Sequence, residues 1–175
     1  MQATNAAIEV LGPDDGAFAQ IGPMGVRFMV GAERDAGFSL VEHPIAPRAL
    51  AAPLHTHTRE DEYSYVLEGR MGALLGDEVL VAEVGDLVFK PRNQWHTFWN
   101  AGDEPCRILE IISPAGFEHF FQELSDGGGA LAMDPEELAA LNERYGLEMQ
   151  PDTVPGLVER FGLRLGEHLT GGWRP

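Results

Sequence analysis

The sequence predicts a mainly β protein, an antiparallel β-barrel of the jelly-roll (double-stranded β-helix) type followed by a C-terminal helical tail. Two observations support this fold class. Between residues 26 and 112, short segments rich in β-branched and aromatic residues alternate with turns containing Gly, Pro or Asp, as in antiparallel barrels and jelly rolls. After Ser113-Pro114 the spacing of apolar residues changes from the strand period to the helix period.

The predicted strands are separated by residues that interrupt a β-ladder. Gly76-Asp77 lies between two apolar segments and predicts a two-residue hairpin. Residues 44–53 contain too many prolines for a central strand, so we expect a loop there. The predicted strands cover residues 26–30, 38–43, 62–68, 71–75, 78–82, 86–90, 95–99 and 107–112.

Three short helices are expected in the tail. Apolar residues within 117–124 recur at helical spacing and would form one buried face. Asp134, followed by proline and two glutamates, predicts an N-cap for a second helix that runs to about Tyr145 and stops at Gly146. A third helix should begin near residue 152 and continue through Phe161.

The 175 residues suit one folding unit, which we divide into a barrel with an N-terminal extension (1–116) and the helical tail (117–175). These helices are too short to hold a core of their own, so they should pack on the barrel or on the partner subunit of a homodimer. The formal charge of −16 disfavours nucleic acid and anionic membranes as partners. With one cysteine, Cys106, no apparent secretory signal and no long apolar run, a cytoplasmic protein is expected.

Three histidines and a carboxylate form the pattern that carries chemistry. His55 and His57 are one residue apart and therefore point to the same side of an extended segment. Glu62 follows in the sequence, and His96 lies in a later predicted strand. Three imidazoles and one carboxylate suit one divalent transition metal ion (Fe, Mn, Ni, Cu or Zn) and leave positions open for water or substrate.

These residues lie in two motifs that resemble those of the cupin superfamily. Residues 55–69 match HxHx(4)Ex(6)G, and residues 85–100 match Gx(5)PxGxxHx(3)N except that Asn93 stands where the pattern has glycine. Asn tolerates the left-handed conformation better than most residues, so the turn should survive. The resemblance covers roughly residues 35–113. It implies a cupin barrel with the metal ligands His55, His57, Glu62 and His96.

Two acidic neighbours compete with Glu62 for the carboxylate position. Glu60 leaves too short a spacing after His57, and Asp61 leaves a spacing that the family allows but is the less usual residue type. We interpret both as solvated turn residues. If His96 faces the interior, Ser64 and Phe98 should line the same cavity and offer a pocket to an apolar or planar ligand.

The segment from Ser113 to Leu124, with the tail behind it, resembles small single-domain cupins related to quercetin dioxygenases. This resemblance implies a dioxygenase-like oxidoreductase acting on a small enolic or aromatic substrate, with Glu62 as both ligand and catalytic proton acceptor. Two other hypotheses remain: a metal-dependent isomerase, epimerase or lyase, and a non-catalytic cupin that binds a small molecule. We find no obvious inward lysine or spare histidine for proton transfer, which lowers the isomerase or lyase hypothesis.

Overall fold

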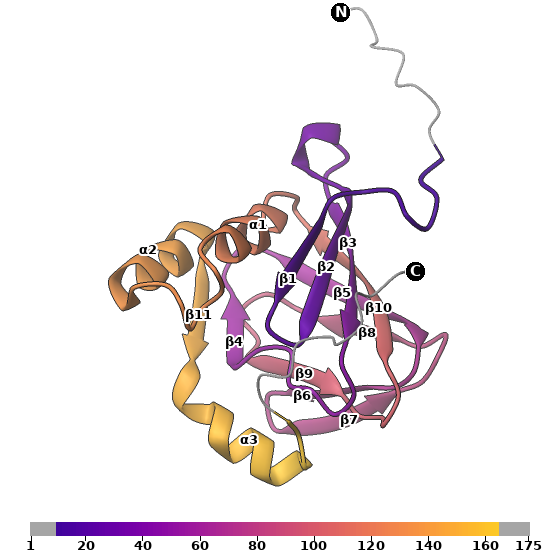
Figure 1. The fold of residues 1–175 in the computed structure, drawn as a ribbon, viewed down its shortest axis with the longest axis vertical. Coiled ribbons are helices and arrows are strands. Elements are labelled where there is room, and N and C mark those ends of the chain that lie inside the picture. The colour runs from indigo at the N-terminus through magenta and orange to yellow at the C-terminus, as the bar shows by residue number, and fades with distance from the viewer. Residues whose placement is uncertain (1–9, 165–175) are drawn as a thin grey trace, which may run out of the picture.

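The computed structural model describes residues 10–164 and shows two antiparallel sheets packed face to face (Figure 1). The sheets do not close into one continuous barrel, and the arrangement is a jelly roll with a helical tail. The six-stranded sheet has the order β1 (Phe18–Ile21), β2 (Met24–Val30), β3 (Ser39–Ile45), β10 (Cys106–Ser113), β5 (Asp61–Glu68) and β8 (Leu87–Lys90). The five-stranded sheet has the order β11 (Leu147–Gln150), β4 (Leu54–His57), β9 (His96–Asn100), β6 (Met71–Leu75) and β7 (Glu78–Ala82).

The core lies between the two sheets because the strands bury alternate residues. In β10, Cys106, Ile108, Glu110 and Ile112 are each at most 1% exposed, while their neighbours are only half-buried. This alternation is the signature of a strand with one face on the core.

The predicted strands are present, with ends that differ by up to two residues, and the sheets contain further strands. Strands β6 and β7 have the expected bounds, and Gly76 takes a positive φ of 58° between them. Strand β3 continues through Pro44 to Ile45, where a loop was predicted. Gly25 in the neighbouring strand makes room for this proline, since a Cβ there would lie 2.8 Å from Pro44 Cγ. Strands β1 and β11 were not predicted, and β4 was expected only as an extended segment around His55 and His57.

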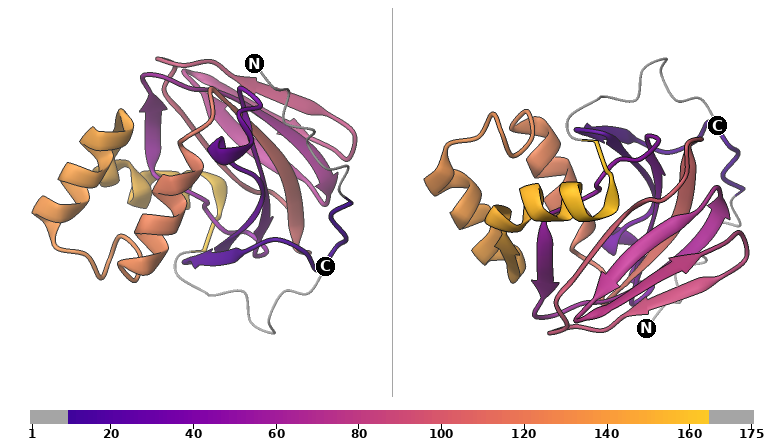
Figure 2. Two further views of the ribbon diagram at one scale, coloured as in Figure 1. Left: turned by 90° about the horizontal axis from the view of Figure 1, so that it is seen from above. Right: turned by 90° about the horizontal axis from the view of Figure 1, so that it is seen from below.

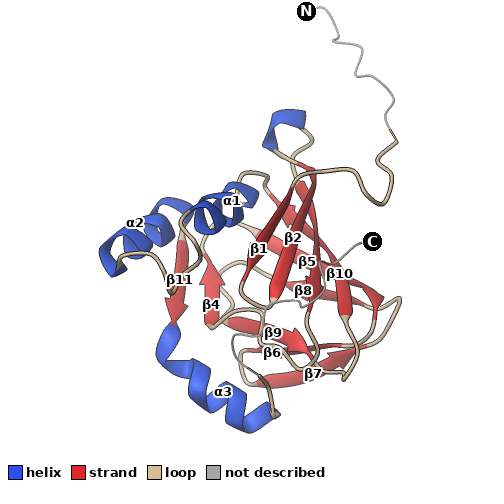
Figure 3. Ribbon diagram, in the orientation of Figure 1, coloured by secondary structure: helices blue, strands red, loops and turns tan. Residues whose placement is uncertain are grey.

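The tail packs beside β4, and Figure 2 shows its helices gathered on that side of the sheets. Helix α1 (Glu118–Asp126) buries its predicted apolar face. Helix α2 (Pro135–Tyr145) begins at the predicted cap, where Asp134 accepts a hydrogen bond from the Glu136 amide, and stops at Gly146. The remaining helical segments are a 3-10 turn at Ala32–Arg34, another at Pro151–Thr153, and helix α3 (Val154–Phe161) (Figure 3).

A second, small apolar cluster attaches α3 to the five-stranded sheet. The Trp99 ring of β9 stacks on Phe161 of α3 with centroids 4.2 Å apart, so this tryptophan faces the tail and not the interior. None of the helices within residues 10–164 has the length and apolar character needed to cross a bilayer. Residues 1–9 and 165–175, which include the ends of the two predicted parts, lie outside the described residues.

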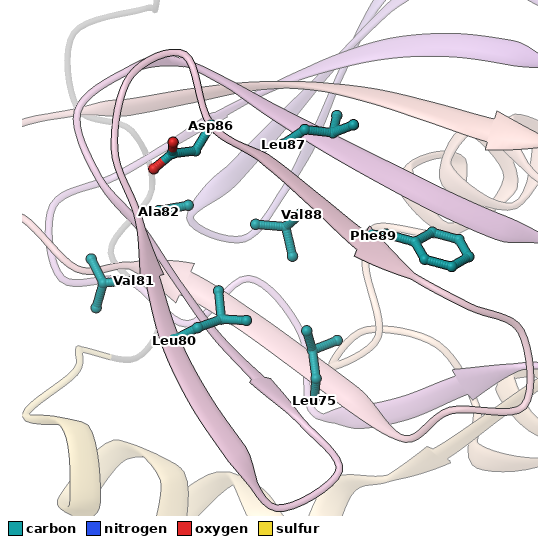
Figure 4. Close-up of a pocket in the computed structure, with 8 residues that line it drawn as sticks. All are labelled: Leu75, Leu80, Val81, Ala82, Asp86, Leu87, Val88 and Phe89. Atoms are coloured by element: carbon teal, nitrogen blue, oxygen red, sulfur yellow. The ribbon is translucent and has the colours of Figure 1, made fainter.

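The edge strands β7 and β8 leave a hollow between the two sheets. Figure 4 shows Leu75, Leu80 and Val88 pointing into this gap, and none of the four predicted metal ligands lines it. Leu87 and Phe89 on the outer side of β8 are about half exposed. These apolar side chains are compatible with a subunit contact, and the homodimer stays a prediction.

His43 is a fully buried histidine in β3, 1% exposed. Its Nδ1 donates to the Gly25 carbonyl at 3.1 Å, and its ring packs on Phe121 of α1. Burial lowers the pKa of His43 to about 4, while the backbone hydrogen bond to Gly25 raises it and the charges of Lys90 and Glu62 act in opposite directions. The side chain is therefore neutral at neutral pH.

The His43 pKa predicts a stability change with pH. Between pH 4 and 6.5 the native protein binds fewer protons at His43 than the unfolded chain, so this contribution is present above pH 6.5 and is lost as the pH falls. Relative to His43→Gln, which does not titrate, the wild type should lose on the order of 2 kcal/mol between pH 7.5 and 5. Urea unfolding at both pH values measures this difference, and parallel pH profiles would contradict it.

Gly72 of β6 provides a test of packing against Trp99. A Cβ at Gly72 would overlap the Trp99 indole ring, so Gly72→Ala should lower the free energy of unfolding by about 1–3 kcal/mol. The control is Gly156→Ala in α3, where a Cβ would meet no atom within 4 Å and should add up to about 1 kcal/mol through helix propensity. Thermal denaturation distinguishes the two, and equal melting temperatures would contradict the prediction.

Candidate metal centre

The fold brings the four predicted ligands together from three strands. His55 and His57 lie on the same face of β4, Glu62 begins the inward face of β5, and His96 starts β9 directly opposite His55. One ligand atom from each of these four residues lies within 4.8 Å of the others, and all four side chains are buried. Within residues 10–164 this is the group of His, Cys, Asp and Glu residues that could hold a metal ion.

Two of the imidazoles are oriented by backbone carbonyls. His55 Nδ1 donates to the Pro53 carbonyl at 2.8 Å, and His96 Nδ1 donates to the Gln94 carbonyl at 2.9 Å. Because a carbonyl oxygen can only accept, each ring carries a proton on Nδ1 and turns its Nε2 toward the cluster. Such orienting hydrogen bonds are the usual support of metal-binding histidines.

The turn between β8 and β9 anchors the backbone of His57. Asn93 adopts the expected left-handed conformation, with φ 62°. Its amide donates to the His57 carbonyl at 2.7 Å, which ties β4 to this turn. The His57 ring nitrogens have no hydrogen-bond partner within the described part of the chain.

Glu62 completes the donor set. Its Oε1 lies 3.4 Å from His57 Nε2, and its Oε2 lies 3.3 Å from His96 Nε2. A buried nitrogen without a partner costs free energy unless something binds it, and His57 Nε2 and His96 Nε2 are both in this state among the described residues. Three imidazoles converging on one carboxylate fit a divalent transition metal.

The protonation states suit metal binding. Burial lowers the pKa of His57 to about 4 and that of His55 well below its usual value. Burial alone would raise the pKa of Glu62, but Lys90 and the neighbouring histidines hold it well below its usual value. His55 and His57 are therefore neutral imidazoles and Glu62 is an ionised carboxylate, the forms that bind metals.

Lys90 is the main feature that sequence reasoning missed. Its Nζ is fully buried, 2.8 Å from Glu62 Oε2 and 3.2 Å from Glu110 Oε2. The expectation that no lysine or spare histidine points inward was therefore wrong, since Lys90 and His43 both do. The signal was the alternation of β8, where Val88 and Lys90 share the buried face, but a lysine before Pro91 at a strand end suggests an exposed residue.

The two predicted pocket residues are partners of this charged group. The Ser64 hydroxyl donates to Glu110 Oε2 at 2.7 Å, and the Phe98 ring lies under Lys90, with Nζ 4.6 Å from its centroid. Burial raises the pKa of Glu110 to about 7, although Lys90 lowers it. Both pocket residues are buried, and their contact with a substrate stays a prediction.

The acidic neighbours of Glu62 differ from each other. Asp61 faces outward and forms an ion pair with Arg92 at 2.8 Å. Glu60 is 6% exposed, so its interpretation as a solvated turn residue was wrong. Its Oε2 lies 4.0 Å from His57 Nδ1, and burial raises its pKa to about 7. Glu60 therefore lies behind the His57 ring, on the Nδ1 side.

The tail covers the cluster from outside. Phe117, just before α1, places its ring edge-on to His57 with centroids 4.4 Å apart. Strand β11 pairs with β4, so Leu147 lies opposite His57 and Met149 opposite His55. The candidate metal centre is thus enclosed by both sheets and by the tail.

Comparison with known proteins agrees with this architecture. Residues 42–112 match the family model of the cupin domain. A 60-residue segment is 33% identical to the tetracenomycin polyketide synthase protein TcmJ of Streptomyces glaucescens, covering 34% of this chain and 40% of that protein. A 65-residue segment is 34% identical to an uncharacterized protein of Methanocaldococcus jannaschii, covering 37% and 52%. The chain thus spans about half or less of the curated relatives it matches.

Solved structures share the fold at low sequence identity. KdgF from Halomonas sp. has a TM-score of 0.57 and 15% identity over 65% of this chain and 99% of its own. A predicted oxalate decarboxylase from Thermotoga maritima has a TM-score of 0.56 and 17% identity over 61% and 99%. The nucleoside dehydratase Pac13 of Streptomyces has a TM-score of 0.52 and 15% identity over 65% and 88%. Residues 42–112 match the cupin domain, and the described part of the chain shares its fold with solved structures that include a cupin-superfamily protein.

Proposed function

We propose that this protein is a divalent-metal-dependent enzyme that acts on a small, oxygen-rich organic molecule. The observation that carries the proposal is the cluster of four buried donor atoms from His55, His57, Glu62 and His96 within 4.8 Å. When bound, a divalent metal would supply a template and a Lewis acid for substrate oxygens. The protein's own contribution is to orient the donors, to exclude water and to place charge nearby.

The residues around the cluster have distinct tasks in this proposal. His55 and His96 are held by backbone carbonyls, so their orientation does not depend on the ligand. Lys90 places a positive charge beside Glu62. Burial by Phe117 and β11 keeps bulk water away and so strengthens these electrostatic interactions. The role of Glu62 as proton acceptor stays a prediction.

The first candidate reaction is a dioxygenase-like oxidation of an enolic or aromatic substrate. It is supported by the resemblance of the tail and by the relative that belongs, by its name, to a polyketide synthase, since polyketides contain enolic and phenolic oxygens. In such a reaction O2 is the oxidant and both of its atoms enter the product, so no further reductant is required.

The second candidate is a non-oxidative reaction, such as isomerisation or elimination. One specific observation favours it: Lys90 and Glu110 are polar groups buried next to the ligands, and this class of enzyme needs a polar group besides the ligands near the metal. Lys90 and Glu110 supply the polar group whose expected absence had counted against this class.

Metal content is the first prediction to test. Protein purified without chelator should contain close to one Fe, Mn, Ni, Cu or Zn per chain by elemental analysis. His96→Ala and Glu62→Gln should each lower metal affinity at least tenfold, because each removes one donor. His119→Ala is the matched control. The His119 imidazole is 57% exposed, and the residue lies in α1, outside the three strands that carry the ligands. Metal retained equally by all variants would contradict the assignment of the centre.

Oxygen dependence separates the two candidate reactions. The metal-loaded protein should consume O2 in an electrode assay with a flavonol or another enolic substrate, and His96→Ala should abolish this consumption. Substrate conversion under strict anaerobiosis would instead favour the non-oxidative reaction. Tight ligand binding without product in either atmosphere would leave a binding protein and overturn the enzymatic proposal.

A further inference from the structure

Lys90 is unusual in the sequence as well as in the structure. The chain has 12 lysine and arginine residues, and Lys90 is the only lysine among them. This one ammonium is fully buried. Among the described residues, Arg27 is also buried and pairs with a buried carboxylate. Arg48, Arg92 and Arg144, by contrast, make their ion pairs at positions that are about a third exposed or more. Burying an ammonium costs free energy, so a lysine confined to this position indicates a local requirement for a compact positive charge.

The Lys90 ammonium contacts two carboxylates and one aromatic ring. Its Nζ lies 2.8 Å from Glu62 Oε2 and 3.2 Å from Glu110 Oε2, and the electron-rich face of Phe98 lies on another side at 4.6 Å. An ammonium has three donors, and two carboxylates leave at least one for another acceptor. Glu62 Oε2 is also the oxygen that lies 3.3 Å from His96 Nε2. The ammonium therefore touches the metal cluster directly.

We propose that Lys90 is a fixed second cation of the metal centre, which weakens metal binding and strengthens the binding of an anionic substrate oxygen. The inference rests on the metal binding in the proposed function but not on which reaction occurs. Lys90 acts on the metal through Glu62 and is in that sense a positioning residue. The substrate class it assigns is a small organic anion, such as an enolate or a carboxylate, bound between the two cations.

The two effects have opposite signs for one physical reason. A metal ion that enters the cluster meets a like charge one carboxylate away, and the enclosed site offers little water to screen the repulsion. An anion that enters after the metal meets two positive charges in the same low-dielectric space. Removing Lys90 should therefore tighten metal binding and weaken anion binding. Simple damage to the fold would weaken both.

The test measures both affinities in Lys90→Met, which keeps an unbranched side chain only one atom shorter and removes the charge. Co(II) affinity is measured by competition with a chelating dye, and azide affinity by the visible spectrum of the Co(II)-loaded protein. Relative to the wild type, we expect Co(II) to bind at least tenfold more tightly and azide at least tenfold more weakly. Arg92→Met is the matched control: it removes the same charge from the surface, and both affinities should change less than threefold.

Two results would overturn the inference: unchanged affinities in Lys90→Met, or both affinities weakened in a variant with native circular dichroism. If Lys90→Met does not fold, the wild type still provides a test. Protein labelled with 15N at the lysine Nζ has one lysine signal, and this signal should shift when Zn(II) is added and again when azide follows. A lysine signal whose chemical shift stays the same after both additions would contradict the proposal. A wild type that binds no Co(II) or Zn(II) would refute the proposed function itself.

Discussion

A carboxylate buried among three imidazoles needs a cation beside it, because an isolated ion in a protein interior costs several kcal/mol. Glu62 has this cation in Lys90, and Lys90 in turn is balanced by Glu110, which accepts a hydrogen bond from Ser64. The chain of contacts joins β5, β8 and β10 across the six-stranded sheet. The apolar core closes around this polar group, so the alignment of these three strands and the shape of the metal centre depend on the same ion pairs.

Much of the fold could be predicted because its signals are local. Gly76 marks the β6–β7 hairpin, and Asp134 and Gly146 mark the ends of α2 within the helix's own sequence. The missed parts depend on partners distant in the chain. Strand β11 forms because β4 offers it a free edge, and Pro44 stays in β3 because Gly25 leaves space for its ring. Neither condition can be seen in the segment concerned.

In the candidate site, too, local spacing could be predicted and burial by distant segments could not. The spacing of His55, His57, Glu62 and His96 in two motifs was enough to bring these residues together as predicted ligands, because strand periodicity decides which side chains share a face. The burial of Lys90 and Glu60 is decided by neighbouring strands and by the tail. Residue type alone therefore suggested solvent exposure for Glu60 and gave no indication that Lys90 is buried. Fold likeness at 15–17% identity to proteins with different names does not identify the reaction, since one fold hosts many chemistries.

The pairing of β11 with β4 also affects how the centre would be filled. Met149 and Leu147 lie across the two strand positions that carry His55 and His57, and Phe117 covers the His57 ring. A short strand of four residues at the margin of a sheet opens more readily than the central strands. The rate at which a metal ion or a substrate enters the centre would then be limited by the opening of β11 and not by diffusion of the ion or substrate through water. In that case the affinity of the centre would depend on its donors, whereas the rate of exchange would depend on the tail.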